Sequence, residues 1–456
     1  MSNILGERAI VIGGSIAGLM TARVLADFFD QVTILERDQI DFQPVIHKSI
    51  PQGNHLHALL AGGQRVMSLL FPNFTDKLES MGAVRLRGGK DVAIILPDGK
   101  AYTPTGSVRE PRDLGFDLYC QSRPLLEDCI RQCTLAFPNV KFQSGCSVQE
   151  LIWKNKRVEG VRFTHDGNTN SLSAELTIDA GGRGSRVPRW LNELGFQVPA
   201  ETTIGVDFAY SSAKYRILGY KGEPERFVGF FGTAPHFPNG AGLEQIENDT
   251  WLVSLGGRFG EYPPTDEDGF LAFAKSLHTQ RLYEIIKDAE RVSDIFHHRF
   301  PTSVLRHYER LASFPESLLV LGDAISSFNP VYGQGMSSAA LQVEVLQESL
   351  AARAQVAQGL EGLAPVFFAK TAEVIAAPWA LAAAADFAYP QTTGERPPNA
   401  EEGARYFAAL DALQAEDIEV SRLVSDVFNL VKPLSVLYDE PLRSRVLARQ
   451  GELENA

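Results

Sequence analysis

A glycine-rich segment near the N-terminus has residue types that suit the binding of a dinucleotide. Residues 13–18 read Gly-Gly-Ser-Ile-Ala-Gly and follow a short apolar run at 9–12. Glycines at a strand-to-helix turn let the backbone approach a pyrophosphate, and the N–H groups of the helix N-terminus stabilise its charge. The residues expected to form this contact are Gly13, Gly14, Ser15, Ala17 and Gly18. Ser15 stands where the G-x-G-x-x-G pattern has its second glycine, so the match is incomplete.

An acidic residue follows at the position where such a motif uses one. Glu36 ends the next apolar run, and Arg37 comes directly after it. A carboxylate here accepts a hydrogen bond from an adenosine ribose, whereas a 2′-phosphate requires a basic residue. The sequence therefore favours FAD or NAD over NADP as the bound dinucleotide.

A second glycine-rich segment lies far along the chain, after the apolar run 318–321. It begins with Gly322-Asp323 and continues through Pro330 to a Gly333-Gln334-Gly335-Met336 turn. The carboxylate of Asp323 suits ribityl or ribose hydroxyls. The backbone N–H groups of 333–336, at a helix N-terminus, suit a pyrophosphate and a flavin carbonyl. Together with the first turn, this segment predicts a flavoprotein.

A third segment, residues 179–186, reads Asp-Ala-Gly-Gly-Arg-Gly-Ser-Arg after a predicted strand at 175–178. Its glycines allow a tight turn where the backbone can approach a ligand, and Gly182 is the expected contact. The alternative is a purely structural turn.

Basic side chains could complete this site. Arg123 directly precedes Pro124 at the start of a helix predicted over 123–136. Its guanidinium could bind flavin hydroxyls or a phosphate. The alternative is an arginine in solvent at a helix start.

His55 and His57, preceded by Lys48, form another candidate group. They could contact the flavin edge or a substrate, or they could be ordinary surface histidines. No third ligand has suitable spacing, so no metal site is expected. The pair His297-His298 is expected in a loop and is assigned no role.

The apolar run 374–385 carries Pro378 and Trp379. We expect the proline to interrupt the helix, which leaves a segment too short to span a bilayer. Core packing is the simplest role for Trp379, and the alternative is the wall of a tunnel for a hydrophobic substrate.

Composition narrows the class of protein. The chain has 456 residues, 44% of them apolar, with a net charge of −13, which argues against nucleic-acid binding and against a basic membrane-docking surface. Four cysteines in one stretch lack metal spacing and fit free thiols of a reducing compartment: Cys120, Cys129, Cys133 and Cys146. The N-terminus lacks a basic region and an apolar stretch, so we expect a cytoplasmic protein with no transmembrane segment.

The elements that must position these residues form an α/β fold. The opening strand, helix and strand are expected at 9–12, 16–27 and 32–35. The strand at 318–321 resumes this parallel sheet, with 337–352 as its crossover helix. An inserted antiparallel sheet is predicted from alternating strands at 205–211, 226–232 and 250–255, with a hairpin at 93–102. The last hundred residues read as helical.

These predictions give a Rossmann-like FAD-binding domain with an inserted antiparallel β-sheet substrate domain and a C-terminal helical region. The FAD-binding domain is expected to comprise residues 1–90, 118–198 and 298–355. The substrate domain comprises 91–117 and 199–297, and the helical region comprises 356–456.

The three segments together resemble the flavoprotein monooxygenases of the para-hydroxybenzoate hydroxylase superfamily. Within it the chain looks most like the flavin epoxidases of polyether antibiotic biosynthesis. Their Pro-Gln-x-x-His-x-His stretch is matched at 51–57, and their Asp-Ala-x-Gly-Arg-Gly-Ser-Arg motif is matched at 179–186. The run 328–340 and the late Pro378-Trp379 also match.

The resemblance implies non-covalent FAD, with adenosine at Glu36 and Arg37 and the ribityl chain near Asp323 and Arg123. The backbone N–H groups of Gly335 and Met336 are assigned the catalytic role of stabilising negative charge on the reduced flavin. The other cofactor contacts expected are Lys48, Val148, Gly182, Pro330, Gly333 and Gln334. Substrate contacts are expected at His55, His57 and Trp379.

The reaction implied is insertion of one oxygen atom from O₂ into a hydrophobic natural product through a flavin C4a-hydroperoxide, with alkene epoxidation as the best guess. Electrons would come from NADH or NADPH, or from a partner flavin reductase, because Gly181 replaces the Asp usual in members that use NAD(P)H directly. The alternatives are an aromatic ring hydroxylase, a flavin-dependent double-bond reductase and a non-catalytic flavin-binding protein. The Trp-x-Trp-x-Ile-Pro motif of flavin halogenases is absent.

Overall fold

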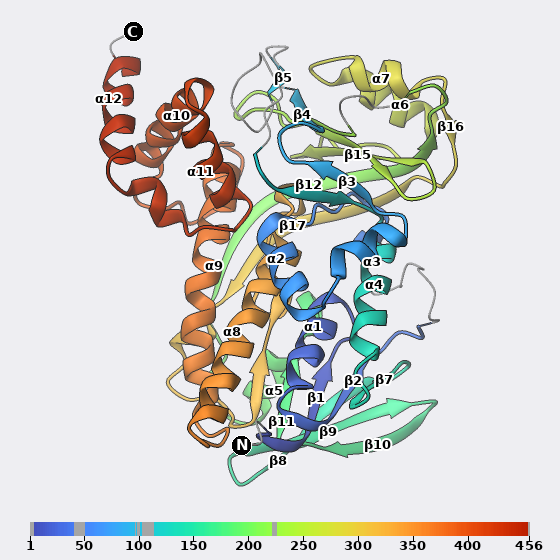
Figure 1. The fold of residues 1–456 in the computed structure, drawn as a ribbon, viewed down its shortest axis with the longest axis vertical. Helices are drawn as coiled ribbons and strands as arrows, with labels where there is room; N and C mark the ends of the chain where they lie inside the picture. Colours follow the sequence, from blue (N-terminus) through green and yellow to red (C-terminus); the bar gives the residue numbers. More distant parts are fainter. Residues whose placement is uncertain are drawn as a thin grey trace.

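The computed structural model describes residues 4–40, 51–95, 97, 101–102, 114–220 and 226–454. Lys48, one of the predicted cofactor contacts, lies outside these residues. The chain forms a lower lobe around a parallel sheet and an upper lobe around a larger sheet, with a helical region beside the upper lobe (Figure 1). The long helix α9 (Leu363–Phe387) runs from the lower lobe to that helical region.

In the described part of the chain, five parallel strands form the lower sheet in the order β18-β11-β1-β2-β7. Their bounds are Gly6–Ile12 (β1), Phe29–Leu35 (β2), Val140–Gln143 (β7), Leu176–Asp179 (β11) and Leu318–Val320 (β18). Helix α1 (Ile16–Leu25) connects β1 to β2, which confirms the predicted βαβ unit. The carboxyl ends of these strands meet at one edge, where the predicted glycine turns follow β1, β11 and β18.

The prediction that the helix after β18 is a crossover is wrong. Helix α8 (Gly335–Gln355) starts two residues earlier than predicted and leads into α9, with no further parallel strand in the described residues. It packs against α1, α2 (Ala61–Leu70) and α9. Strand β18 is therefore the edge of the parallel sheet, and α8 covers one of its faces.

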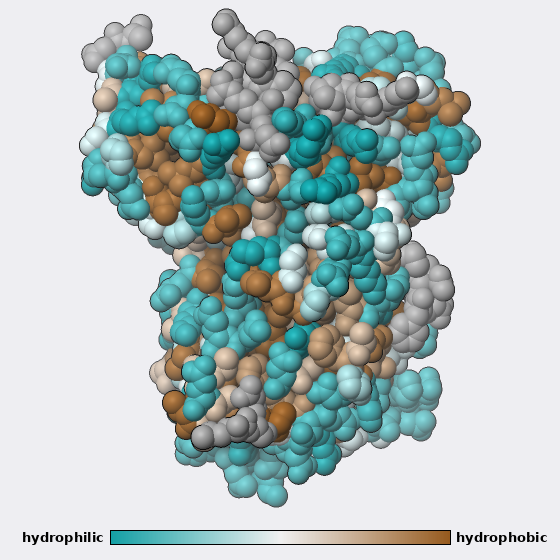
Figure 2. Space-filling model, viewed as in Figure 1, coloured by the Kyte–Doolittle hydropathy of each residue, from teal (hydrophilic) through white to brown (hydrophobic). Residues whose placement is uncertain are grey.

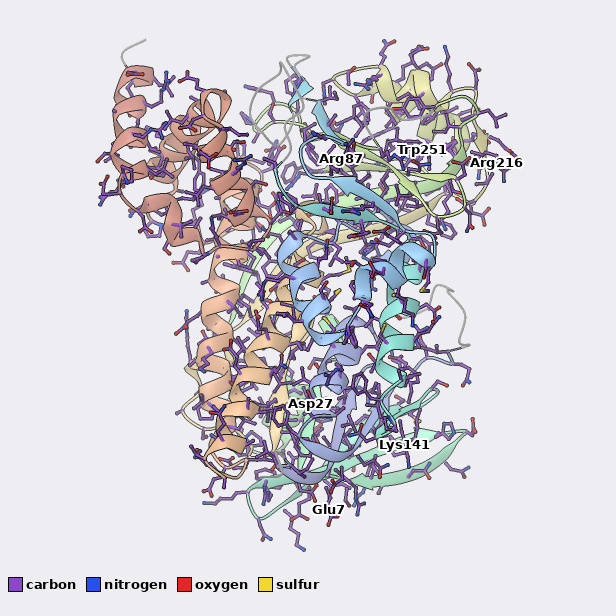
Figure 3. The ribbon with its side chains drawn as sticks, in the orientation of Figure 1. Glu7, Asp27, Arg87, Lys141, Arg216 and Trp251 are labelled. Atoms are coloured by element: carbon purple, nitrogen blue, oxygen red, sulfur yellow. The ribbon has the colours of Figure 1, made fainter. Side chains whose placement is uncertain are left out.

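The upper sheet confirms the predicted antiparallel insert, with order β19-β17-β12-β15-β14-β13-β4-β5 in the described residues and with β16 and β20 paired to β12. The bounds are Val92–Ile95 (β4), Ala101–Tyr102 (β5), Glu201–Arg216 (β12), Phe227–Phe230 (β13), Gly240–Ile246 (β14), Thr250–Arg258 (β15), Glu290–Arg291 (β16), Phe296–Arg306 (β17), Ser326–Ser327 (β19) and Thr393–Gly394 (β20). The hairpin β4–β5 forms as predicted, although β4 joins β13 in parallel. Helices α6 (Glu267–Ser276) and α7 (Arg281–Ile286) pack on this sheet over the buried Trp251 (Figure 3).

The expectation that His297 and His298 lie in a loop is wrong. Both belong to β17, where they pair with Ser211 and Tyr210 of β12. The flanking residues Phe296 and Phe300 alternate with polar residues, as a strand with one buried face does. The two histidines therefore point to opposite faces of the sheet.

The remaining elements surround the lower sheet. A three-stranded sheet comprises β8 (Ser147–Lys154), β9 (Arg157–His165) and β10 (Asn168–Ser173), and β3 (Val84–Arg87) pairs with β6 (Asp117–Cys120). The helices here are α3 (Phe74–Ser80), α4 (Arg123–Leu135) and α5 (Val187–Glu193). Helix α2 starts at Ala61, directly after Leu60, whose backbone is extended. The four cysteines carry free thiols.

Pro378 does not interrupt α9, which corrects another expectation. The helix runs through the buried proline for 25 residues, and it is the one helix of the described chain long and apolar enough to cross a membrane. Of its most apolar 18-residue window, 44% is buried against the rest of the protein. Apolar core helices of globular proteins meet the same criteria of length and composition.

The predicted C-terminal helical region is confirmed as α10 (Ala400–Glu416), α11 (Ile418–Phe428) and α12 (Leu442–Glu454). These helices enclose their own apolar cluster around Leu410, Val424 and Val446. Apolar residues also reach the surface of this region, at the upper left of Figure 2. The large exposed ones are Phe428, Val431, Tyr438, Leu447 and Leu453.

Candidate functional site

A cavity of about 530 Å³ lies between the carboxyl edge of the parallel sheet and the upper sheet, and we call it the first cavity. All three predicted glycine segments reach it, although they are far apart in the chain. The predicted contacts that line it are Gly13, Ser15, Ala17, Glu36, Arg37, His57, Arg123, Val148, Gly182, Asp323, Pro330, Gly333, Gly335 and Met336. The ends of the parallel strands therefore bring these segments together, as expected at the switch point of a doubly wound sheet.

The first turn is packed too tightly for side chains. Gly13 has φ +100°, and a Cβ there would lie 2.6 Å from the Ala180 carbonyl oxygen of the second turn. A Cβ at Gly18 would lie 1.9 Å from the Gly13 carbonyl oxygen. A side chain at either position would therefore force the start of α1 or the second turn to move. The backbone N–H groups there are available to a ligand because Ser15, the N-cap residue, makes no capping bond.

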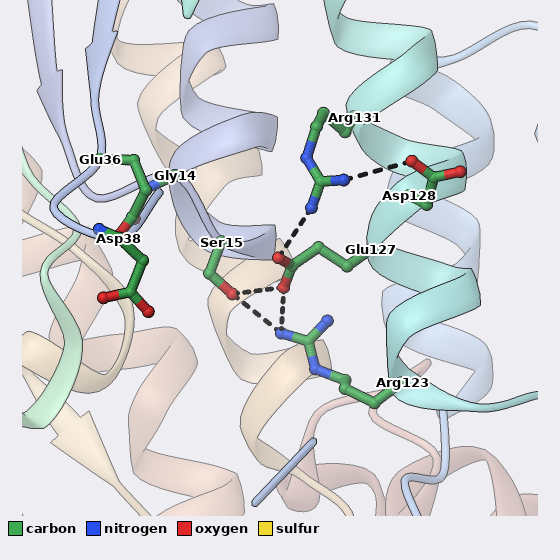
Figure 4. Close-up of polar contacts among 8 residues, drawn as sticks. All are labelled: Gly14, Ser15, Glu36, Asp38, Arg123, Glu127, Asp128 and Arg131. Carbon is green, nitrogen blue, oxygen red and sulfur yellow. Dashed lines mark hydrogen bonds and ion pairs between the residues drawn. The ribbon is translucent and has the colours of Figure 1, made fainter. Parts of the chain in front are cut away.

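The Ser15 hydroxyl instead joins a charged network with α4 (Figure 4). It donates to Glu127 Oε2 at 2.8 Å and accepts from Arg123 Nη2 at 3.0 Å. Arg123 also pairs with Glu127 at 3.2 Å, and Arg131 pairs with the other Glu127 oxygen at 3.1 Å. The serine in the second-glycine position therefore ties the dinucleotide turn to the helix that carries Arg123.

Arg123 is 7% exposed, so it is not the solvent arginine of the alternative interpretation. Its second terminal nitrogen, Nη1, is buried and has no hydrogen-bond partner among the described residues. A buried guanidinium N–H without a partner is costly unless a ligand accepts from it. Arg123 lines the first cavity, where such a ligand would lie.

Glu36 lies at the end of β2, as predicted, and orders the loop around it. Its Oε2 accepts from the Gly14 N–H at 2.7 Å, and Oε1 accepts from the Asp38 N–H at 2.8 Å (Figure 4). Each carboxylate oxygen retains a second lone pair for a ligand hydroxyl. Gly14 itself packs against Phe142 and does not line the cavity.

The second turn is held by the buried Asp179. It accepts hydrogen bonds from the Gly181 N–H at 2.9 Å and from the Ser185 hydroxyl. Gly182, with φ +68°, and Gly184 both line the cavity, and a Cβ at either would have no protein atom within 4 Å. The turn thus presents bare backbone to an open space, as a ligand cradle does.

The third turn adds a second helix N-terminus. Helix α8 begins at Gly335, and its N-cap residue Gln334 makes no capping bond. Burial raises the pKa of Asp323 on the preceding turn, although Arg183 and Arg123 nearby favour its charged form. Asp323 and the first residues of α8, Gly335 and Met336, all line the first cavity.

The end of the cavity toward the upper sheet is lined by residues that were given no role from the sequence: Arg183, Tyr210, His298 and Phe300. Arg183 lies over the Phe300 ring at 4.3 Å, and Tyr210 meets His298 edge-on at 5.6 Å. The alternation of Phe296 and Phe300 around the histidine pair was the available signal. Burial and Arg183 lower the pKa of His298.

His55 and His57 differ in where they lie. His55 is 1% exposed behind Tyr210, at 4.1 Å between ring centroids, and its Nδ1 bonds to the Ser212 hydroxyl at 2.7 Å. His57 lines the cavity and donates from Nδ1 to the His55 carbonyl at 2.8 Å. Burial lowers the pKa of His55 to about 2 and that of His57 to about 4, so both rings are neutral near pH 7. Neither is an ordinary surface histidine.

Some predicted contacts do not line the first cavity. Gly14, Gly18 and Gln334 lie behind the turns, and His55 lies behind Tyr210. Trp379 lines a second cavity and packs near Phe328, at 6.0 Å between ring centroids. Core packing is therefore part of its role.

The residues present fit FAD. Two helix N-termini without side-chain caps and the unused N–H of Arg123 suit a pyrophosphate. Glu36 and Asp323 provide carboxyl acceptors for the sugar and ribityl hydroxyls at two places along the cavity. The cradle at Gly182 and Gly184 leaves space for the bulk of a dinucleotide. No group of three or more His, Cys, Asp or Glu in the described chain could hold a metal ion.

Sequence comparison finds a relative over almost the whole chain. No family model matches. Protein Rv3254 of Mycobacterium tuberculosis is 30% identical over 456 residues, which cover 98% of this chain and 94% of that protein. The squalene monooxygenase of mouse is 24% identical over 371 residues, and the match spans 76% of this chain and 55% of that enzyme. Squalene monooxygenase SE1 of Panax ginseng is 26% identical over 43% of this chain and 34% of its own length.

Solved structures share the architecture from end to end. The flavin-dependent brominase Bmp2 has a TM-score of 0.69 at 15% identity, covering 99% of this chain and 98% of that one. The p-nitrophenol 4-monooxygenase PnpA of Pseudomonas putida has a TM-score of 0.64 at 18% identity, covering 94% and 99%. At such identities the likeness establishes the fold.

Proposed function

The chain belongs to the same family as Protein Rv3254 of Mycobacterium tuberculosis and has the fold of flavin-dependent monooxygenases, and on this basis we propose that it is an FAD-dependent monooxygenase acting on an uncharged, hydrophobic organic substrate. Bound FAD, once reduced, would activate O₂ and supply one oxygen atom to the substrate. We expect the enzyme to work in the cytoplasm.

The observation that carries this proposal is the convergence of three separate glycine turns on one cavity. The N-termini of α1 and α8 and the buried Arg123 concentrate N–H donors there, and no capping side chain uses them. A dinucleotide supplies the matching acceptors along its whole length. Three turns with only a structural role would not need to meet at one cavity and leave N–H donors unused there.

The chain's own residues would bind and orient the reactants. The N–H groups of Gly335 and Met336 would stabilise negative charge at the adjoining edge of the flavin ring. Asp323 would hold the ribityl hydroxyls, and Arg123 the phosphate or a neighbouring hydroxyl. The apolar cavity wall would exclude water from the reacting atoms.

The substrate end supports an uncharged, hydrophobic substrate. Phe300, Tyr210 and Leu56 contribute apolar surface. His57 is neutral near pH 7, and the charge of Arg183 at this end is opposed by the nearby Asp323. Neutral His57 donates from Nδ1 to the His55 carbonyl, which leaves Nε2 as an acceptor for a substrate hydroxyl. These features and the squalene monooxygenase relatives support alkene epoxidation as the specific reaction.

We also propose that this chain receives its electrons in a different way from enzymes that bind NAD(P)H directly. Gly181 replaces the usual acidic residue, and a Cβ there would lie 2.7 Å from the Asp179 carboxylate. Asp179 already holds the turn together, so position 181 has little room for a second side chain. We expect reduction to be faster with a flavin reductase than with NADPH alone.

The test is reconstitution followed by turnover. The purified protein is titrated with FAD, and O₂ uptake is measured with NADH, NADPH or a flavin reductase in the presence of alkenes or phenols. Epoxide formation with one ¹⁸O from ¹⁸O₂ is the expected result. Hydroxylated phenols would favour the aromatic hydroxylase instead, and a protein that never binds FAD would overturn the proposal.

A further inference from the structure

A second cavity, of about 440 Å³, lies on the other side of the segment that carries Asp323. It is bounded by α9 and by the ends of β12 and β17. Its lining includes Tyr308, Glu309, Phe368, Thr371, Ile375 and Trp379. This volume is within the range of about 300–1,000 Å³ that is typical of small-molecule sites.

The walls are mainly apolar. Tyr308 stacks on Phe368 at 5.2 Å between ring centroids, and Ile375 and Trp379 continue this surface along α9. Most of these side chains are fully or largely buried. The cavity could therefore take an aromatic or alicyclic body.

Two hydroxyl groups in this apolar wall are unused. Tyr308 is 2% exposed and Thr371 is 1% exposed, and neither hydroxyl has a hydrogen-bond partner among the described residues. A buried hydroxyl without a partner costs about 1–3 kcal/mol, so such groups usually meet a ligand or an ordered water. A single oxygen atom on a ligand could bond to one or both.

The charged groups of the cavity neutralise one another. Glu309 accepts from His307 Nδ1 at 2.8 Å and pairs with Arg310 at 3.3 Å. The other ring nitrogen of His307 bonds to the Thr202 hydroxyl at 2.7 Å. No charge is left over in the lining for an ionic ligand, so the site favours an uncharged one.

We propose that the second cavity is a distinct binding site for an uncharged, apolar molecule that carries one hydroxyl or carbonyl oxygen. The ring system packs against Phe368 and Trp379, and the oxygen bonds to Tyr308 and Thr371. The site is separate from the first cavity, but they share a wall. Ile325 follows the turn that carries Asp323, and Trp379 meets Phe328, which lines the first cavity.

The test uses 2-naphthol and naphthalene as probes, which differ by one hydroxyl group. Each is measured by equilibrium dialysis against the FAD-loaded protein. We expect 2-naphthol to bind in the second cavity roughly five- to tenfold more tightly than naphthalene. The double variant Tyr308→Phe/Thr371→Val should reduce this difference in affinity to less than twofold without weakening the binding of naphthalene.

A blocking variant assigns the binding to this cavity. Ala372 lines it, so Ala372→Phe should abolish the binding of both probes in this cavity, and any binding that remains belongs to the first cavity. Ala380, exposed on the same helix and outside the lining, provides the matched control Ala380→Phe, which should bind like the wild type. The proposal is overturned if neither probe binds, if Ala372→Phe binds them unchanged, or if the preference for 2-naphthol survives loss of both hydroxyls.

Discussion

Arg123 combines deep burial with a hydrogen-bond donor that the protein does not use. Glu127 balances its charge and Ser15 accepts from one nitrogen, yet Nη1 has no partner in the described chain. The same side chain lines the cavity at the N-terminus of α1. Arg123 is therefore suited to bind an anionic or hydroxyl-rich ligand.

Replacing this guanidinium should weaken FAD binding. Arg123→Met keeps the aliphatic stem and removes the charge-assisted hydrogen bonds, worth about 1.5–3 kcal/mol. We expect the Kd for FAD to rise roughly 10- to 100-fold, measured by quenching of flavin fluorescence. Arg85→Met removes an exposed pair with Asp117 and should leave the Kd unchanged. An unaltered Kd in Arg123→Met would contradict the assignment.

The histidines near the substrate end should make the protein sensitive to acid. His55 has its pKa lowered from 6.5 to about 2 by burial. Below pH 6.5 the unfolded chain binds a proton that the folded chain excludes, so stability is lost as pH falls. The limit for one such group is about 1.4 kcal/mol per pH unit.

His55→Asn isolates this effect. On acidification from pH 6.5 to 5, we expect the wild type to lose about 2 kcal/mol more unfolding free energy than the variant. Urea unfolding at each pH measures the difference, and any constant cost of the lost Ser212 bond cancels. Equal acid losses in the two proteins would show that His55 titrates alike in the folded and unfolded chains.

At the residue scale, the sequence predicts ligand contacts best where backbone geometry restricts residue type. The glycines at 13, 182 and 335 lie where a side chain would collide with the backbone or enter the cavity. Tyr210 and His298 were missed because their role depends on the pairing of β12 with β17. The alternation of side chains along a strand predicts that one of two adjacent histidines faces inward. The pairing of β17 with β12 decides which face of the sheet borders the cavity.

One buried network connects three elements around the third turn. Asp386 Oδ1, on α9, accepts from Arg258 Nη1 at 2.7 Å, from Asn329 Nδ2 at 2.8 Å and from the Tyr332 hydroxyl at 2.7 Å. Arg258 belongs to β15 of the upper sheet, and Asn329 and Tyr332 flank Pro330 at the cavity. This network fixes the glycine turn before α8 relative to both the helix and the sheet.

Asp386→Asn should loosen that turn and destabilise the protein. The change leaves Arg258 buried without a counter-charge, which typically costs about 3–5 kcal/mol. We expect lower resistance to urea and faster release of FAD, followed by stopped-flow fluorescence.

The double variant Asp386→Asn/Arg258→Met supplies the control for charge. Removing both partners should recover part of the lost stability, because no unpaired buried charge remains. FAD release should stay fast, since the neutral amide that replaces the carboxylate would hold Asn329 and Tyr332 only through weaker, uncharged hydrogen bonds. A loss of stability in the double variant equal to the sum of the losses in Asp386→Asn and Arg258→Met would contradict a coupled network.

At the element scale, local patterns identified the βαβ unit and the inserted sheet, but not how the later helices connect. Pro378 lies within α9 because tertiary packing on both sides of the helix outweighs the loss of one backbone hydrogen bond. Strand β4 pairs in parallel with β13, which lies far away in the chain, and no local signal encodes that pairing.

At the scale of the whole molecule, the C-terminal helices touch the lobe that carries the site. The Gly62 N–H, at the start of α2, donates to the Asn429 carbonyl at 2.8 Å. Helix α2 follows directly on the segment with Leu56 and His57, which line the first cavity. The C-terminal region thus supports one wall of the site from behind.

Adding a methyl group at Gly62 should disturb this contact. A Cβ at Gly62 would lie 2.3 Å from the Leu430 carbonyl oxygen, so Gly62→Ala must displace the chain after α11. We expect a loss of roughly 1–3 kcal/mol, larger than the gain of up to about 1 kcal/mol in helix propensity. Limited proteolysis should cut near residues 429–441 several times faster than in the wild type. Gly403→Ala, inside α10 with no atom within 4 Å of the new Cβ, should leave cleavage unchanged or slower. If Gly62→Ala behaves like Gly403→Ala, the C-terminal helices do not hold this wall.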